Sequence, residues 1–362
     1  MPSSTYCRDD LSPNTKDPLE ALSRPTSDQI SLDSYVTAGE KDPEERDNMY
    51  LETAGFSDSS QSPWDLYTEL AGASNDPPAM SSILKAITAQ PRAVESPCWT
   101  EYQLDACHVD LLRQRLEECG VSEKVRSGYF SELGIFVHEA HSYTHSIYAC
   151  HFSRYFFKKL DHLSSSPEEE ACVAHIVDSG SSDAKAKDST NKDYHQPDNF
   201  YSHFFSIHHG CCLEIACTQK RARLNDLAEF YFFDSDRQTQ VLVCIDFDAD
   251  RSKKATLLTW RRSGGKLTAH VQDIRTEDGK LVPGDSLRIT MLEIAPPDRI
   301  PPSMHNMAIE FSVQELVEIL ELAESARAKW DEIQRAKNTV PIVPKPTAWL
   351  PDGVEGASKP NS

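Results

Sequence analysis

The 362-residue sequence lacks long apolar runs and any excess of positive charge. No stretch approaches the ~18 apolar residues of a membrane span, and the N-terminus lacks the pattern of a secretory signal. We therefore expect an intracellular protein, nuclear or cytoplasmic, with no membrane partner. Lys and Arg number 37 against 57 Asp and Glu, a net charge of −20. This balance argues against a general nucleic-acid-binding protein, because contacts to phosphates need cationic side chains.

The ten cysteines include no CxxC pair, which is the usual spacing of a structural zinc site. Several lie at apolar positions of expected helices and strands, so we expect reduced, buried thiols. The sequence also lacks a glycine-rich phosphate loop and any local signature of a serine or cysteine protease. Proteolysis and phosphate-loop nucleotide binding are therefore not indicated.

Charge and apolar content divide the chain into three parts. Residues 1–95 contain 7 basic and 17 acidic side chains and little apolar periodicity, so we expect a disordered acidic tail. Residues 337–362 are rich in proline and are expected to form an extended tail. One folded domain of ordinary size remains at 96–336. Within it, 163–196 is poor in apolar residues and predicts a mobile insertion.

Apolar periodicity predicts an α/β or α+β order of elements within the domain. The expected closing helix begins with the capping-box pair Ser312 and Glu315. The run at 240–248 has little polar alternation and predicts a central strand covered on both faces. The expected helices are 100–120, 126–160, 221–235 and 311–334, and the expected strands are 198–207, 210–218, 240–248, 253–261, 266–275 and 285–295.

Glu214 lies in the middle of an otherwise apolar, strand-like run. A buried carboxylate without a partner is costly, so Glu214 must be exposed, paired or bound to a cation. Sixteen residues earlier, Asp198 follows Pro197 at the start of the preceding expected strand. Two carboxylates on adjacent strands of one hairpin suit Mg²⁺, which prefers hard oxygen ligands. The alternative is that Asp198 merely begins a strand and Glu214 points to solvent.

A wider pattern surrounds the two carboxylates. It consists of Pro197-Asp198, Glu214, Thr218-Gln219, the Leu224 to Ala228 helix pattern, Ser235-Asp236, the strand from Val241 to Asp246, and Trp260-Arg261. Over about 197–262, this pattern resembles the PD-(D/E)xK restriction-endonuclease-like superfamily. More narrowly, it resembles a poorly characterised group of such domains common in filamentous fungi. The resemblance implies a restriction-endonuclease-like α/β core, a small mixed sheet flanked by helices.

The resemblance also implies a site and an activity. Asp198 and Glu214 would be the ligands of Mg²⁺, and the activity would be hydrolysis of phosphodiester bonds in DNA or RNA. The lysine of the superfamily stands two residues after the glutamate, and here that position is Ala216. Gln219 or Lys220 could supply the missing donor as a catalytic group. Either Glu132 or Glu139 could complete the site.

Ala216 and the acidic net charge favour a rival hypothesis. The same fold would then be catalytically inactive and would serve as a protein-interaction module, with the acidic N-terminal tail binding a protein partner. A third hypothesis assigns a short helical docking motif to the tail, because Trp64, Leu66 and Leu70 are spaced for one helix face. Whether the chain is an enzyme stays open at this stage.

Two histidine patterns and one basic set are further candidates. His138, His141 and His145 share one face of the expected helix at 126–160, but the run is not HExxH and no cysteine pair accompanies it, so we expect surface or interhelix histidines rather than a zinc site. His208 to Cys212 predicts a turn with buried thiols, since adjacent strand residues face opposite sides. Eight basic residues near the ends of expected elements would form a phosphate-binding face if those ends converge, or else solvated loop charge: Lys220, Arg221, Arg223, Arg251, Lys253, Lys254, Arg261 and Arg262.

Overall fold

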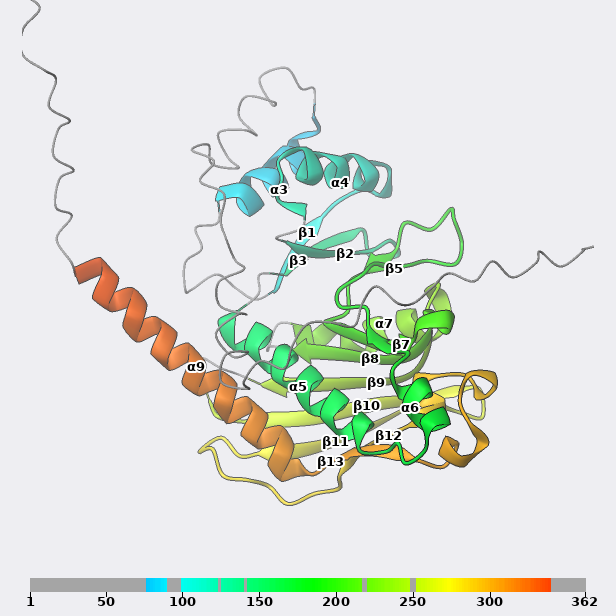
Figure 1. Ribbon diagram of the computed structural model, residues 1–362. Helices are drawn as coiled ribbons and strands as arrows, with labels where there is room; N and C mark the ends of the chain where they lie inside the picture. The colour runs from blue at the N-terminus through cyan, green and yellow to red at the C-terminus, as the bar shows by residue number, and fades with distance from the viewer. Residues whose placement is uncertain are drawn as a thin grey trace, which may run out of the picture. The chain divides into compact units, whose positions relative to one another are not determined.

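The computed structural model describes residues 76–89, 99–122, 125–139, 142–216, 220–247 and 252–339 (Figure 1). The chain divides into the units Met1–Ser59 and Ser60–Ser362, and every described residue belongs to the second. That unit is a mixed α/β structure with three sheets. Of the helices in the described ranges, none has the length and apolar character needed to cross a membrane.

The larger sheet has six strands in the order β11-β10-β9-β8-β7-β4. Strands β8 and β9 run parallel, and helix α7 connects them, whereas the other neighbouring pairs are antiparallel. The strands are β4 (Ile176–Asp178), β7 (Asn199–His203), β8 (His209–Ala216), β9 (Gln238–Phe247), β10 (Ala255–Ser263) and β11 (Lys266–Arg275). Helix α7 spans Leu224–Glu229 and continues into the π-helical turn η5 at Phe230–Asp234.

A second sheet has the order β1-β3-β2-β6-β5, and a two-stranded sheet pairs β12 with β13. These strands are β1 (Trp99–Gln103), β2 (Arg126–Phe130), β3 (Ile135–Glu139), β5 (Ala184–Lys185), β6 (Tyr194–His195), β12 (Leu287–Thr290) and β13 (Ala308–Phe311). The remaining α-helices are α3 (Pro78–Ala89), α4 (Val109–Glu118), α5 (Tyr143–Asp161), α6 (Pro167–Val173), α8 (Met291–Ile294) and α9 (Val313–Thr339).

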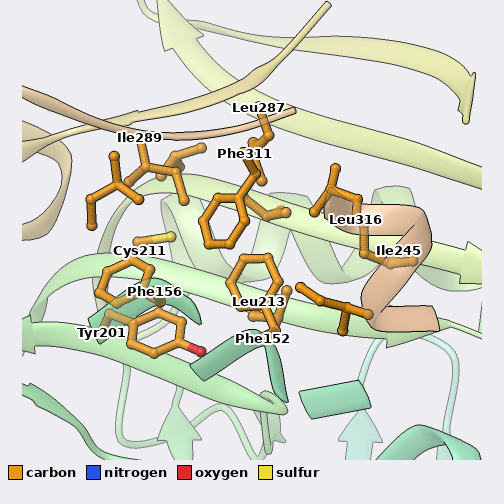
Figure 2. Close-up of a cluster of buried hydrophobic side chains, with 14 of the residues drawn as sticks. Phe152, Phe156, Tyr201, Cys211, Leu213, Ile245, Leu287, Ile289, Phe311 and Leu316 are labelled. Atoms are coloured by element: carbon orange, nitrogen blue, oxygen red, sulfur yellow. The ribbon is translucent and has the colours of Figure 1, made fainter. Parts of the chain in front are cut away.

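One face of the six-stranded sheet carries the largest hydrophobic cluster (Figure 2). Helix α5 contributes Phe152 and Phe156, and the ring of Phe156 stacks on Tyr201 of β7 with centroids 4.0 Å apart. Phe311 of β13 stacks on Phe152 at 4.7 Å. Because alternate strand residues share a face, Leu213 of β8 points into the same cluster. The cluster fixes β7 and β8 from one side.

The opposite face of β8 and β9 packs against α7 and the smaller sheet. Cys212 and Ala216 of β8 join Trp99 and Val137 of the smaller sheet in this second cluster. Cys211 belongs to the first cluster, so the two adjacent cysteines face opposite sides of the sheet, as alternation predicts. The far side of the smaller sheet packs against α3 and α4 in a third cluster. Glu214 therefore lies on the face that meets the smaller sheet.

Several sequence predictions agree with these elements. The side chain of Ser312 accepts the N–H of Glu315 at 3.2 Å, and the Glu315 carboxylate accepts the N–H of Ser312 at 2.8 Å, which confirms the capping box. Gly120 ends α4 with φ 63°, a left-handed conformation that glycine adopts without strain. Trp330 of α9 is 39% exposed, and its ring stacks on that of Tyr143 with centroids 5.4 Å apart.

Other predictions are wrong in part. The expected helix at 126–160 is a hairpin, β2 and β3, followed by α5, which begins at Tyr143. The segment 163–196, expected as an insertion, contains α6 and strands of both larger sheets, β4, β5 and β6. Helix α3 lies inside the range 1–95 that was expected to be disordered, and it buries Met80, Ile83 and Leu84. Positions 1–75 and 340–362 lie outside the described residues.

Candidate functional site

Asp198 and Glu214 lie across from each other where β7 begins and β8 ends. Asn199 pairs with Leu213 in the β7–β8 ladder, and the N–H of Asp198 donates to the carbonyl of Leu213 at 3.0 Å. The carboxylate of Asp198 also accepts the N–H of Ile215 at 2.6 Å. Glu214 is 1% exposed and Asp198 8% exposed, so the alternative in which Glu214 points to solvent is wrong.

A buried arginine from the smaller sheet reaches these carboxylates. Nη1 of Arg126, the first residue of β2, donates to Oδ1 of Asp198, and Nη2 donates to the backbone carbonyl of Gln196. Nη1 also lies 3.5 Å from a carboxylate oxygen of Glu139, which pairs with Arg126 across β2 and β3. We call Asp198, Glu214 and Glu139, with Arg126, the acidic centre. It joins the two larger sheets through charge.

The guanidinium of Arg126 and the carboxylates around it stabilise one another in their charged forms. Burial alone would lower the pKa of Arg126, but the carboxylates of Asp198, Glu139 and Glu214 outweigh burial and raise that pKa above its usual value. Arg126 is therefore a permanent cation, although its side chain is only 5% exposed. A buried ion pair that loses one partner leaves an uncompensated charge, so the guanidinium and the carboxylates depend on each other for stability.

Two further side chains fix the orientation of the carboxylates. The hydroxyl of Tyr231, in the π-helical turn after α7, donates to Oε1 of Glu214 at 2.7 Å. Burial and the neighbouring Glu214 raise the pKa of Tyr231 far above its usual value, so Tyr231 is a neutral hydrogen-bond donor. Nε2 of His145, in the first turn of α5, contacts Oδ1 of Asp198. The side chains in and around the centre thus come from β2, β3, α5, β8, the turn after α7 and the residue just before β7.

A small cavity with polar and apolar walls adjoins the acidic centre. Its volume is about 10 Å³, the size of a single water molecule, and its walls include Glu139, Glu214, Tyr231, His195 and Gln196. Trp99 and Leu227 close its apolar side. The cavity gives Glu139 and Glu214 room for one small polar group between the smaller sheet and β8.

The donor set of the acidic centre can be compared with the needs of Mg²⁺. Among the described residues, no group of three or more His, Cys, Asp and Glu side chains is arranged to hold a metal ion. Two carboxylates completed by a backbone carbonyl are a smaller set of hard oxygen donors, and Asp198 with Glu214 fits it in ligand type. A positive charge, the guanidinium of Arg126, already lies against Asp198. The centre therefore matches a divalent cation in ligand type, while the charge of Asp198 is already balanced by Arg126.

The other predicted site residues have different positions. Ala216, at the usual position of the lysine, is 1% exposed and belongs to the second hydrophobic cluster. Gln219 lies outside the described residues, and so does the side chain of Lys220, whose backbone begins the short helix η4 (Lys220–Arg223). Glu132 is exposed in the turn between β2 and β3, whereas Glu139 lies in the acidic centre. Of the two glutamates, only Glu139 is therefore close to Arg126 in the described structure.

The three histidines predicted on one helix do not share an element. His138 is in β3, His145 is in α5, and His141 lies outside the described residues. The prediction that the three histidines share one helix face is wrong, because the segment folds as a hairpin followed by a helix. The run from His208 to Cys212 belongs to the start of β8 and the turn before it. The tail motif around Trp64 lies outside the described residues.

Within the described ranges, the basic residues do not all lie at one end of the sheet. Lys253 and Lys254 precede β10, while Arg261 and Arg262 are near its far end, so about seven strand residues, roughly 25 Å, separate them. Four of the described members are also paired with carboxylates: Arg223 with Glu101 at 2.9 Å, Lys253 with Glu324 at 2.8 Å, Lys254 with Asp273 at 2.9 Å and Arg261 with Glu293 at 2.6 Å. The side chains of Arg221 and Arg251 lie outside the described part of the chain.

Sequence reasoning missed Arg126, His145 as an aspartate partner, and Tyr231. Arg126 is 72 residues from Asp198 along the chain, and no local spacing links them. One signal was present: Gly134 lies between two short apolar runs, and a glycine at that spacing is typical of a hairpin turn. A hairpin there would have placed Arg126 opposite Glu139.

Comparison with known proteins adds no assignment. No family model matches the chain. No curated protein matches it either.

Proposed function

We propose that the chain is a restriction-endonuclease-like, cation-dependent phosphodiesterase that acts on nucleic acid. The observation that carries the proposal is the placement of Asp198 and Glu214 opposite each other on adjacent strands, with Arg126 and the third carboxylate Glu139 beside Asp198. The mixed sheet, with a helix crossing between the parallel strands β8 and β9, supports the same proposal.

Each residue of the centre has a role in this proposal. Asp198 and Glu214 hold Mg²⁺, which supplies Lewis-acid stabilisation of the charge on the phosphate. Tyr231 orients the carboxylate of Glu214 through its hydrogen bond. The cavity beside Glu139 and Glu214 admits one water-sized group next to the carboxylates. Arg126 provides positive charge where Ala216 replaces the lysine of the superfamily.

A second candidate function has its own supporting observation. Arg126 already neutralises Asp198, and a buried ion-pair network of this kind can join two sheets without any catalysis. In that case the chain is a catalytically inactive nuclease-like fold that serves as a protein-interaction module. The acidic N-terminal residues, with 17 acidic and 7 basic side chains in 1–95, would then bind a basic partner.

A cleavage assay tests the first proposal. The full chain is incubated with supercoiled plasmid and with single-stranded DNA and RNA, in Mg²⁺, in Mn²⁺ and in EDTA. We expect cleavage only with a divalent cation, and Glu214→Gln should reduce it by about 10²-fold or more, because a ligand is lost while the shape is kept. The matched control is Glu310→Gln, an exposed glutamate of β13 paired with Arg288 at 3.3 Å, which should keep full activity.

Two outcomes contradict the proposal. Cleavage that is equal in the wild type and Glu214→Gln, with both folded by circular dichroism, would assign the activity to another site or another protein. Absence of cleavage by the wild type on every substrate with either cation would favour the inactive fold.

A further inference from the structure

We propose that Arg126 is a built-in competitor of the divalent cation at the acidic centre, so that its ion pair with Asp198 sets the cation affinity of the site. The inference deepens the proposed function, since it concerns the same cation. It assigns to Arg126 a positioning and regulatory role that the sequence pattern does not contain.

The geometry supports competition for one carboxylate. Oδ1 of Asp198 contacts both Arg126 and His145, and Oδ2 accepts the N–H of Ile215 at 2.6 Å. A cation that binds Asp198 must therefore displace or lengthen at least one of these contacts. Ile215 is held in the β8–β9 ladder opposite Ile245, so its backbone N–H stays in place and the side-chain contacts of Arg126 and His145 are the ones free to change.

Arg126 has other acceptors to which it can turn. Nη1 lies 3.5 Å from Glu139, and Nη2 donates to the carbonyl of Gln196. Within the described residues, its buried Nε–H has no hydrogen-bond partner. The guanidinium thus contacts Glu139 and the carbonyl of Gln196 besides Asp198, and its Nε–H is a further donor that could form a hydrogen bond. Releasing Asp198 to a cation leaves Arg126 paired with Glu139 rather than stranded.

Charge makes the competition strong. Arg126 and a divalent cation are both positive and would lie within a few ångströms of the same buried carboxylate. Repulsion between like charges at such a separation lowers the affinity for the cation by more than a factor of ten, even with the effective dielectric constant of about 20 that suits protein sites. Removing the positive charge of Arg126 should therefore tighten cation binding by about tenfold or more.

The test is a titration of Mn²⁺ alone into the full chain by isothermal calorimetry, with no nucleic acid present. Arg126→Met keeps much of the side-chain volume and removes the charge, and we expect it to bind Mn²⁺ at least about tenfold more tightly than the wild type. Adding Asp198→Asn to Arg126→Met should abolish this gain. The matched control is Arg113→Met, which removes a half-exposed arginine paired with Asp183, and its affinity should equal that of the wild type.

Arg126→Met can fail to fold without metal, because it strands buried carboxylates. In that event Mn²⁺ in the buffer should restore a cooperative thermal transition, and buffer without divalent cations should not. Arg126→Lys provides a second measurement, because it keeps the charge but loses the forked contact, and its affinity should fall between the wild type and Arg126→Met.

An unchanged Mn²⁺ affinity in Arg126→Met, or in Arg126→Lys where the first variant does not fold even with Mn²⁺, would overturn the inference. The result is separate from the cleavage assay. A gain of Mn²⁺ affinity in Arg126→Met without any cleavage by the wild type would support the inference and contradict the nuclease function. Cleavage with an unchanged Mn²⁺ affinity would support the nuclease function and contradict the inference.

Discussion

At the scale of single residues, the acidic centre shows how buried charge is balanced inside this chain. Arg126, Asp198, Glu139 and Glu214 all belong to the buried residues. Each carboxylate would be costly alone, and the arrangement is stable because the guanidinium and the hydroxyl of Tyr231 face them. Glu214 could be predicted to need a partner, because its neighbours along the strand are apolar. Which partner it has could not be predicted, since Tyr231 lies 17 residues away in a π-helical turn.

His138 is a second buried polar residue with a measurable consequence. It is 2% exposed in β3, and burial lowers the pKa of its imidazole to about 4. Within the described part of the chain, its Nδ1 has no hydrogen-bond partner. The histidine is therefore neutral in the folded protein and becomes protonated readily only when the chain unfolds.

This difference predicts a loss of stability in acid. Between about pH 6.5 and pH 4 the unfolded chain binds a proton at His138 that the folded chain does not, so the free energy of unfolding falls as the pH falls through this window. The loss attributable to His138 should reach about 3 kcal/mol at most. Urea unfolding at several pH values measures it, and His138→Phe should flatten the pH dependence in this window.

Exposed His162, just after α5, serves as the control, and His162→Gln should keep the pH dependence of the wild type. An equal slope in the wild type and His138→Phe would show that other groups carry the acid sensitivity.

At the scale of elements, sequence pattern predicted long segments well and short ones poorly. Helix α9 and strands β9, β10 and β11 were predicted because each is at least nine residues long, α9 with a helical period and β9 with a nearly continuous apolar run. The hairpin of β2 and β3 was mistaken for a helix, since Tyr129, Phe136 and Val137 fit helical spacing as well as they fit two five-residue strands. Strands β4, β5 and β6 have two or three residues each, too few for any period.

The hairpin of β7 and β8 depends on close contact at Gly210. A Cβ at this position would lie 2.2 Å from the backbone carbonyl oxygen of Tyr201 and 3.0 Å from the ring of Phe200. Backbone cannot move aside without breaking the strand pairing, so Gly210→Ala should lower the free energy of unfolding by about 2 kcal/mol or more. Because this hairpin carries Asp198 and Glu214, cation affinity should fall as well.

Gly284→Ala is the matched control for this prediction. Its Cβ would approach only the end of the flexible Gln272 side chain, at 2.8 Å, which can turn away. Guanidinium unfolding of both variants makes the comparison. A Gly210→Ala variant as stable as Gly284→Ala would mean that β7 and β8 are not paired in the described register.

At the scale of the whole molecule, the candidate site is assembled from parts far apart in the sequence. The pair of Asp198 and Glu214 could be foreseen, because a hairpin brings its two strands together. Arg126, Glu139 and His145 come from a second sheet and from α5, and only tertiary packing brings them to β8. Among the basic residues that would form one face if their elements converged, Lys253 and Lys254 precede β10 and Arg261 and Arg262 lie near its other end, so the strand separates the two pairs.

The central claim is that Asp198 and Glu214 together bind one divalent cation. Crystals of the full chain soaked in Mn²⁺ test it by anomalous diffraction, because the metal scatters at its own absorption edge. The account predicts a peak with carboxylate oxygens of both Asp198 and Glu214 in its coordination sphere, at about 2.0–2.3 Å, and with the guanidinium of Arg126 turned away from Asp198 toward Glu139. The claim would be contradicted if saturating Mn²⁺ gave no anomalous peak at the acidic centre and Arg126 still contacted Asp198.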